Sequence, residues 1–338
     1  MVAVKPFGMF EGREVTQYTL TSPGGVEVDI LDWGVVVRDW RVPVPGGGTR
    51  SVVLGFERFE HYPAHSPYFG AICGRVANRI ANARFTLDGT THTLIANEGT
   101  ATLHGGPTGL SLRVWDAVPD DATNAVVFST ESPAGEGGYP GHLRIKATYR
   151  LDGNRLRLEL GATTDRPTPV NIVQHLYFNL GTGTDVLDHR YQFNAGAHTE
   201  LGAALIPTGN IIEDHPGDEW YLRAPRTLRD AAGKPIGYDG NLVLDSGRDV
   251  AAPVGTVVSP DGDLTLKLWT DQPGVQFYNA VTTNAPAGLG IGGRTYGPYS
   301  GFCVEDQLFP DAVNHPHFPS SIITPERPYA HWCEIEIA

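Results

Sequence analysis

The chain has 338 residues, of which 41% are hydrophobic and 19% charged, a composition that supports a large folded core and excludes a mainly disordered protein. The formal net charge is −13 and no basic block is present, which argues against nucleic acids and anionic membranes as partners. No apolar run approaches the length of a membrane span, and the N-terminal residues MVAVKPFGMFEGREV turn polar too early for a signal peptide, so we expect a soluble, cytoplasmic protein.

Short apolar runs separated by turn residues fill the sequence, with 41 Gly and 26 Pro spread throughout as punctuation. This pattern is typical of many strands joined by turns. In chain order, the runs that predict strands are 26–34, 49–56, 124–132, 142–164, 263–270 and 331–338. Amphipathic runs of helical length are scarce, and the best helix candidate is a short segment at 57–63.

The run at 142–164 carries the alternation most clearly. Its apolar residues, which alternate with polar ones on both sides of an Asp-Gly-Asn turn at 152–154, are Leu143, Ile145, Ala147, Tyr149, Leu156, Leu158 and Leu160. Such a pattern predicts a β-hairpin. Because no internal repeat, charge block or long linker interrupts the chain, we predict a single all-β domain over residues 1–338, built as a large antiparallel β-sandwich.

The three cysteines, Cys73, Cys303 and Cys333, are odd in number and far apart in the sequence. They lack the close spacing of a zinc or redox motif. We expect them to be buried thiols without a chemical role.

One histidine lies in an otherwise apolar segment, NIVQHLYFNLG, at residues 171–181. Both faces of this segment are largely apolar at period two, so it predicts a strand covered on both sides. His175 is then buried or at the floor of a cleft, and its reference pKa of about 6.5 lets it carry a proton near neutrality. Taken alone, it fits a hydrogen-bonded core histidine as well as a catalytic one.

Three further polar clusters could supply a partner for His175. They are GRVANRIANARF at 74–85, with Arg75, Asn78, Arg79 and Asn82; TLHGGPTG at 102–109, with His104; and GFCVEDQLFPDAVNHPHFP at 301–319, with Glu305. Each residue alone has a structural explanation, as a salt bridge, a turn residue or a carboxylate at a strand end. A carboxylate and two histidines on rigid elements flanked by Gly or Pro are together suited to general acid and base catalysis.

Other kinds of site remain open but are less well supported. Histidine and carboxylate also bind metals, but no H-x-H or H-E-x-x-H spacing includes His104, His175 or Glu305. The G-x-S-x-G motif of serine hydrolases is absent as well. Glycoside hydrolysis usually needs two carboxylates, and only Glu305 is clearly placed.

At these residues the sequence resembles the aldose 1-epimerase (galactose mutarotase) family nearly from end to end. The segments that carry the resemblance, in shared order, are GRVANRIANARFTLDG, LHGG, SPAGEGGYPG, PVNIVQHLYFNLG, IPTG, GYDGN, PGVQFY, GFCVEDQLFPDAVNHPHFP and ITPERPY. The resemblance implies a large antiparallel β-sandwich and the interconversion of the α and β anomers of a monosaccharide. It also implies that no metal or organic cofactor is needed. We expect a monomer or a homodimer.

The resemblance assigns roles to eight residues. His175 matches the family's general acid and Glu305 its general base. The residues that match positions holding the sugar are Asn78, Arg79, His104, Tyr177, Asp239 and Gln276.

The chain departs from the family pattern around this site. Gln174 and Leu176 replace the usual neighbours of the histidine, Gly240 replaces a histidine, and residues 109–112 and 213–223 also differ. These changes leave the preferred sugar open. They also leave two alternatives: an inactive sugar-binding or regulatory protein on the same fold, or a hexose-6-phosphate 1-epimerase. The latter would need a cluster of basic residues, for which Arg75 and Arg79 are the candidates.

Overall fold

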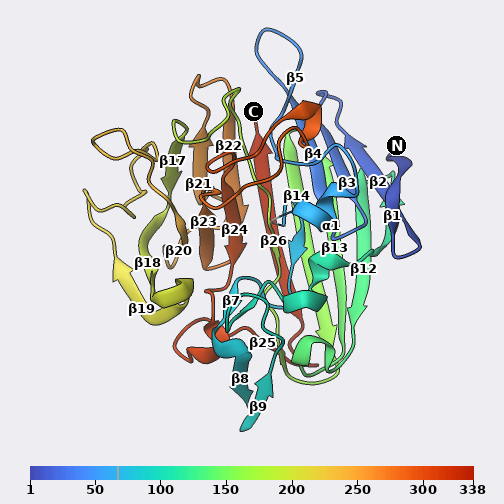
Figure 1. The fold of residues 1–338 in the computed structure, drawn as a ribbon, viewed down its shortest axis with the longest axis vertical. Helices are drawn as coiled ribbons and strands as arrows, with labels where there is room; N and C mark the ends of the chain where they lie inside the picture. Colours follow the sequence, from blue (N-terminus) through green and yellow to red (C-terminus); the bar gives the residue numbers. More distant parts are fainter. Residues whose placement is uncertain (67) are drawn as a thin grey trace.

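The computed structural model describes residues 1–66 and 68–338, whose strands all pair antiparallel (Figure 1). The largest sheet has eight strands. Their order across the sheet is β11 (Asp116–Asp120), β12 (Ala125–Ser132), β13 (Leu143–Asp152), β14 (Arg155–Thr164), β26 (Tyr329–Ile337), β22 (Thr265–Thr270), β21 (Gly255–Val258) and β17 (Arg190–Phe193).

Two five-stranded sheets pack against this large sheet. The first runs in sequence order, through β1 (Ala3–Phe10), β2 (Arg13–Thr21), β3 (Glu27–Leu31), β4 (Val37–Pro43) and β5 (Thr49–Ser51). The second has the order β19 (Pro207–Glu213), β18 (Ala195–Leu201), β20 (Asp239–Leu244), β23 (Gly274–Tyr278) and β24 (Cys303–Gln307). Tyr18 of the first sheet contacts Phe128 of the large sheet at 5.8 Å between ring centroids, and Phe277 of the second contacts Phe193 at 5.4 Å.

Short paired segments and one short helix complete the fold. The two-stranded pairs are β6 (Ile72–Cys73) with β16 (Val173–Gln174), β7 (Arg79–Ile80) with β10 (Thr102–Leu103), β8 (Arg84–Leu87) with β9 (Thr90–Thr93), and β15 (Thr168–Pro169) with β25 (Ile322–Ile323). The helix α1 covers His61–His65. Among residues 1–66 and 68–338, no helix reaches the length and apolar content that a membrane crossing requires.

The prediction of an antiparallel β-sandwich is confirmed, and the core explains why. In the β13–β14 hairpin the predicted apolar positions are buried while the polar ones between them are exposed or half-buried, so one face of the large sheet is apolar. The main apolar cluster draws buried residues from all three large sheets, between Val2 and Ile337. Such a continuous core is what a single domain over residues 1–338 would have.

The prediction of a continuous strand at 171–181 is wrong. Only Val173–Gln174 forms a strand, and Phe178 makes isolated bridges to Val53 and Phe302. The whole segment is nevertheless buried, because it runs through the interior of the sandwich and bonds to segments on either side. The segment is apolar because it is buried on all sides. An apolar composition of this kind is compatible with an irregular segment as well as with a regular strand.

The three cysteines are all buried and form no disulfide, as expected.

Candidate functional site

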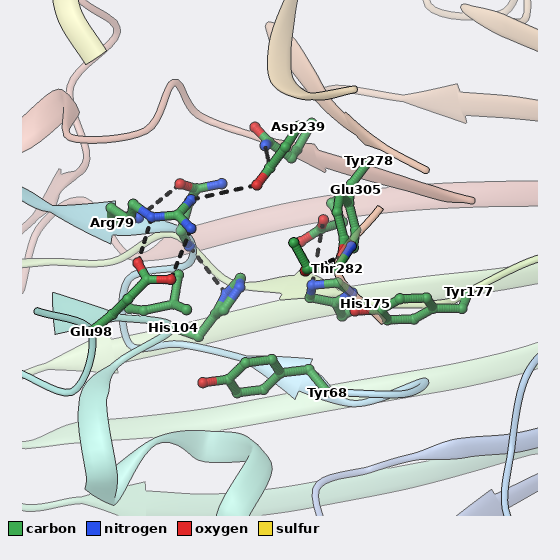
Figure 2. A pocket seen from close by; sticks show the side chains of 13 residues that line it. Tyr68, Arg79, Glu98, His104, His175, Tyr177, Asp239, Tyr278, Thr282 and Glu305 are labelled. Atoms are coloured by element: carbon green, nitrogen blue, oxygen red, sulfur yellow. Dashed lines mark hydrogen bonds and ion pairs between the residues drawn. The ribbon is translucent and has the colours of Figure 1, made fainter. Parts of the chain in front are cut away.

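A small cavity of about 180 Å³ opens at the residues that the sequence singled out (Figure 2). It is lined by Tyr68, Asn78, Arg79, Glu98, Leu103, His104, His175, Tyr177, Asp239, Gln276, Tyr278, Thr282 and Glu305. The structure therefore brings together all eight residues that were predicted for the site, from segments that are up to 227 positions apart, counting from Asn78 to Glu305 (305 − 78). Arg75 and Asn82, from the same polar loop as Arg79, do not line it.

Five lining residues were not predicted. Tyr278 follows Gln276 by two positions on β23, so alternation along the strand could have placed both side chains on one face. Tyr68, Glu98, Leu103 and Thr282 lie outside any pattern of this kind.

Glu305 and Gln276 lie next to each other because they are register partners on β24 and β23. His175 is the first residue after the end of β16. Its backbone N–H donates to the carbonyl of Ala71 at 2.8 Å, and its carbonyl accepts from the N–H of Gly70 at 2.9 Å, so both backbone groups fix its position. These elements place Nε2 of His175 3.6 Å from Oε1 of Glu305.

Aromatic rings hold the His175 imidazole on its faces. The ring of Tyr177 stacks on it at 4.9 Å between centroids with an interplanar angle of 10°, and Tyr68 stacks at 5.8 Å and 20°. Tyr68 also contacts the ring of His104 at 4.6 Å. The imidazole therefore has little freedom to rotate away from Glu305.

Burial works against charge on both members of the pair. It lowers the pKa of His175 to about 3, which favours the neutral imidazole. Burial also raises the pKa of Glu305 well above its usual range, and the nearby carboxylate of Asp239 raises it further. The two groups together therefore hold one proton over a broad pH range, and it belongs to the pair rather than to either residue.

His104 has a defined tautomer. Its Nδ1 accepts a hydrogen bond from the backbone N–H of Asn78 at 3.2 Å, which leaves Nε2 to carry the ring hydrogen. Burial, together with the neighbouring His175 and Arg79, lowers the pKa of His104 well below its usual value. His104 is therefore a neutral hydrogen-bond donor at the cavity.

Several buried polar atoms of the lining have no hydrogen-bond partner among the described residues. They are Nδ1 of His175, Oε2 of Glu305 and Oε1 of Gln276. Buried polar groups are normally paired, so unpaired ones on residues that line a cavity are suited to hydrogen bonds with a polar ligand.

Arg75 serves the fold rather than the cavity. Its buried guanidinium donates to the side chain and carbonyl of Ser132 and to the carbonyls of Pro133, Pro140 and Gly141, at 2.7–2.9 Å. These bonds occupy its donors, so Arg75 does not add a second positive charge for a phosphate.

Two groups of side chains have the geometry to hold a metal ion: His104, His175 and Glu305 at the cavity, and Asp306, His331 and Cys333 in the core. Both contain donor types that bind zinc. In the second group His331 is already ion-paired with Asp306 and Asp271, each at 3.1 Å. In the first group the same side chains can also donate and accept protons without a metal ion. That the protein needs no metal stays a prediction.

Two of the departures from the family pattern, Gly240 and the segment 213–223, are related through a steric contact. A Cβ atom on Gly240 would lie 2.6 Å from the Trp220 indole, which belongs to the divergent segment 213–223. That indole stacks on His198 at 4.9 Å and meets Tyr238 edge-on at 5.0 Å. Trp220 thus occupies the space that a side chain at position 240 would need.

We expect Gly240→His to destabilise the protein by about 1–3 kcal/mol, the usual cost of overpacking. The double variant Gly240→His with Trp220→Ala should recover part of this loss, because the indole no longer fills the space. Urea denaturation of the two single variants and the double variant measures the coupling. Additive effects would show that the two positions do not compete for space.

Comparisons of the sequence with known proteins all find the same family. The sequence matches the model of a family described as Aldose 1-epimerase over residues 16–336. It is 39% identical over 337 residues to a galactose mutarotase of Rattus norvegicus, covering 97% of this chain and 96% of that protein. It is 34% identical over 317 residues to an aldose 1-epimerase of Escherichia coli (strain K12), covering 91% and 90%.

Solved structures show the same likeness. A GalM/aldose epimerase homologue from C. elegans superposes with a TM-score of 0.89 at 26% identity, covering 95% of this chain and 98% of that chain. A galactose 1-epimerase from Lactobacillus acidophilus superposes with a TM-score of 0.86 at 24% identity, covering 100% and 98%, and shares the fold.

Proposed function

Because the chain belongs to the aldose 1-epimerase family and interconverts the α and β anomers of a free aldose, we propose that Glu305 and His175 exchange the two protons that ring opening requires. The enzyme is an isomerase. In this proposal Glu305 acts as general base on the C1 hydroxyl and His175 as general acid on the ring oxygen. Both oxygens are bonded to C1, which suits two catalytic atoms that lie 3.6 Å apart.

The reaction balances without a net change of charge in the cavity. Burial favours the arrangement of the pair with its proton on Glu305, and opening starts from the other arrangement, with the proton on His175. Ionised Glu305 then takes the C1 hydroxyl proton while the C1–O5 bond breaks and protonated His175 gives its proton to O5. The pair then consists of a neutral carboxylic acid and a neutral imidazole. Rotation about C1–C2 exposes the other face of the aldehyde, and ring closure returns both protons. His175 and Glu305 together hold one proton both before and after ring opening. The net charge of the pair therefore stays the same, and no uncompensated charge is created in a desolvated site.

The observation that carries the proposal is the approach of His175 Nε2 to Oε1 of Glu305, 3.6 Å apart in the lining of one polar cavity. The remaining predicted residues orient the sugar. His104 donates from Nε2, Gln276 offers its free carbonyl oxygen, and Asp239 accepts a hydrogen bond from Gln276 at 2.7 Å. Positioning of this kind turns proton transfer into an effectively intramolecular step.

Polarimetry tests the activity directly. Freshly dissolved α-D-galactose, α-D-glucose and α-L-arabinose should each reach anomeric equilibrium faster with the protein than without it, and their relative rates would name the preferred sugar. An aliquot dialysed against EDTA should be equally active. Loss of activity on chelation, restored by zinc, would instead assign His104, His175 and Glu305 to a metal.

The shared proton also predicts an unusual pH profile. An independent imidazolium acid would lose its proton, and with it the activity, as pH rises through about 6.5. Here the pKa of His175 is lowered to about 3 and that of Glu305 is raised, so the pair keeps one proton between these values. We expect kcat/KM to stay constant as pH rises through about 6.5 and to fall only where the pair loses its proton, at the raised pKa of Glu305. Rates corrected for the uncatalysed reaction measure this, and a midpoint near pH 6.5 would count against it.

The alternatives find less support in the site. A protein that only binds sugar has no need for both His175 and Glu305 in proton-transfer range. A hexose phosphate would need a basic cluster, and among the described lining residues Arg79 is the one Arg or Lys. The cytoplasmic location stays a prediction, supported by three free thiols.

A further inference from the structure

Arg79 is held by an acidic partner that no sequence pattern revealed. Its Nε and Nη2 atoms bond both carboxylate oxygens of Glu98, at 2.5 and 2.9 Å. This two-point contact uses the face of the guanidinium that binds carboxylates and phosphates best. The Arg79 side chain is 10% exposed and that of Glu98 is 41% exposed, so Glu98 lies on the solvent side of the pair.

A rigid turn holds Glu98 in place. The backbone N–H groups of Asn97 and Glu98 donate to the carbonyl of Ala101, and the N–H of Ala101 donates back to Glu98, at 2.9–3.2 Å. The Asn97 side chain also bonds the N–H and the carbonyl of Leu103, at 2.7 and 3.1 Å. Glu98 is therefore fixed at the cavity, as a wall residue with a defined direction.

The cavity consequently carries more negative than positive charge. Figure 2 shows Arg79 between Glu98 and Asp239, at the end away from His175 and Glu305. The Arg79 Nη1 atom lies 3.9 Å from Oδ2 of Asp239. One cation thus faces two carboxylates, while the His175–Glu305 pair adds no net charge when it holds one proton.

We propose that Glu98 restricts the enzyme to aldoses without a negative charge, by occupying the anion-binding face of Arg79 and adding its own carboxylate to the cavity. Neutral aldoses enter and can still hydrogen-bond Nη1 of Arg79. An aldose bearing a carboxylate or phosphate would have to compete with Glu98 for the guanidinium while lying beside a like charge. An amino sugar, which is a cation, meets a favourable field. This inference rests on the proposed function, because it concerns the substrate of the same site.

Three sugars of the same ring configuration test the proposal: D-galactose, D-galacturonate and D-galactosamine, assayed by polarimetry at pH 6.5 and low ionic strength. The measured quantity is the ratio of kcat/KM for each charged sugar to that for galactose. We expect Glu98→Gln to raise the galacturonate ratio about tenfold and Glu98→Lys to raise it further, since one and then two charges change near the substrate. The galactosamine ratio should move in the opposite direction.

A matched control removes the same charge elsewhere. Glu159, on β14, is also bonded to an arginine, with its Oε1 2.8 Å from Nε of Arg157, but lies outside the cavity. Glu159→Gln should leave both ratios unchanged. Equal ratios in the wild type, Glu98→Gln and Glu98→Lys would overturn the inference while galactose turnover upheld the proposed function. Failure of the wild type to turn over any aldose would instead contradict the proposed function, and the inference with it.

Discussion

Glu305→Gln is expected to lower kcat for anomer interconversion by about 10²–10⁴-fold, the range typical of a lost general base. The amide has nearly the size of the carboxylate but cannot accept the hydroxyl proton of C1. KM should change much less, because the amide oxygen still accepts a hydrogen bond from the sugar. Polarimetry of galactose under saturating conditions measures both constants.

The stability of this variant provides its control. The pKa of Glu305 is raised in the folded state, so above the reference value of about 4.3 the unfolded chain releases this proton before the folded one does. Between those two pKa values the wild type loses stability as pH rises, and Glu305→Gln does not. The variant should therefore gain stability relative to the wild type as pH rises from about 4.3 toward the raised pKa of Glu305. An inactive variant with unchanged relative stability would show that Glu305 is not desolvated.

Asp306→Ala should cost about 3–5 kcal/mol in the free energy of unfolding, the usual range for removing one partner of a buried ion pair, with Asp271 remaining as the second partner of His331. Asp306 follows Glu305 on β24 and points to the opposite side of the sheet, where its Oδ2 lies 3.1 Å from Nε2 of His331 on β26. The hydroxyl of Thr270 donates to the same oxygen at 2.5 Å. These contacts join the sheet that carries Glu305 to the eight-stranded sheet.

The charge on His331 makes this contact pH-dependent. Burial alone would lower the pKa of His331, but Asp306 and Asp271 outweigh it and raise the pKa to about 9. The stabilisation is therefore complete below the unfolded pKa of about 6.5 and is lost as pH rises through about 9. Urea denaturation at pH 6 and pH 9 measures both effects, with Asp306→Asn as a variant that can keep a hydrogen bond. A loss below about 1 kcal/mol at pH 6 would show that the pair is not desolvated.

The sequence was sufficient to predict the fold class because alternation within the β13–β14 hairpin reports directly which face is buried. It was not sufficient for residues 171–181, since a segment buried on every side has no polar face from which to read a period. A regular strand and an irregular buried segment then have the same composition.

The sequence likewise predicted some residues of the site and missed others. His175 and Glu305 stood out because ionisable side chains are rare in apolar segments. Glu98 did not, because a glutamate in a polar turn has no distinguishing pattern and acquires its significance only from Arg79, which is distant by 19 positions in sequence. The coupling between Trp220 and Gly240 was hidden for the same reason. Contacts between separate segments depend on the tertiary fold and leave no local signal.

The most direct measurement of the central claim, a proton exchange between one imidazole and one carboxyl group, is the polarimetric kcat of His175→Ala, Glu305→Gln and the double variant. Groups that act as one unit lose their function together. We predict that each single variant is slower by about 10²-fold or more, and that the double variant is no slower than the worse of the two. Near-normal turnover in either single variant, or losses that multiply in the double variant, would contradict the account.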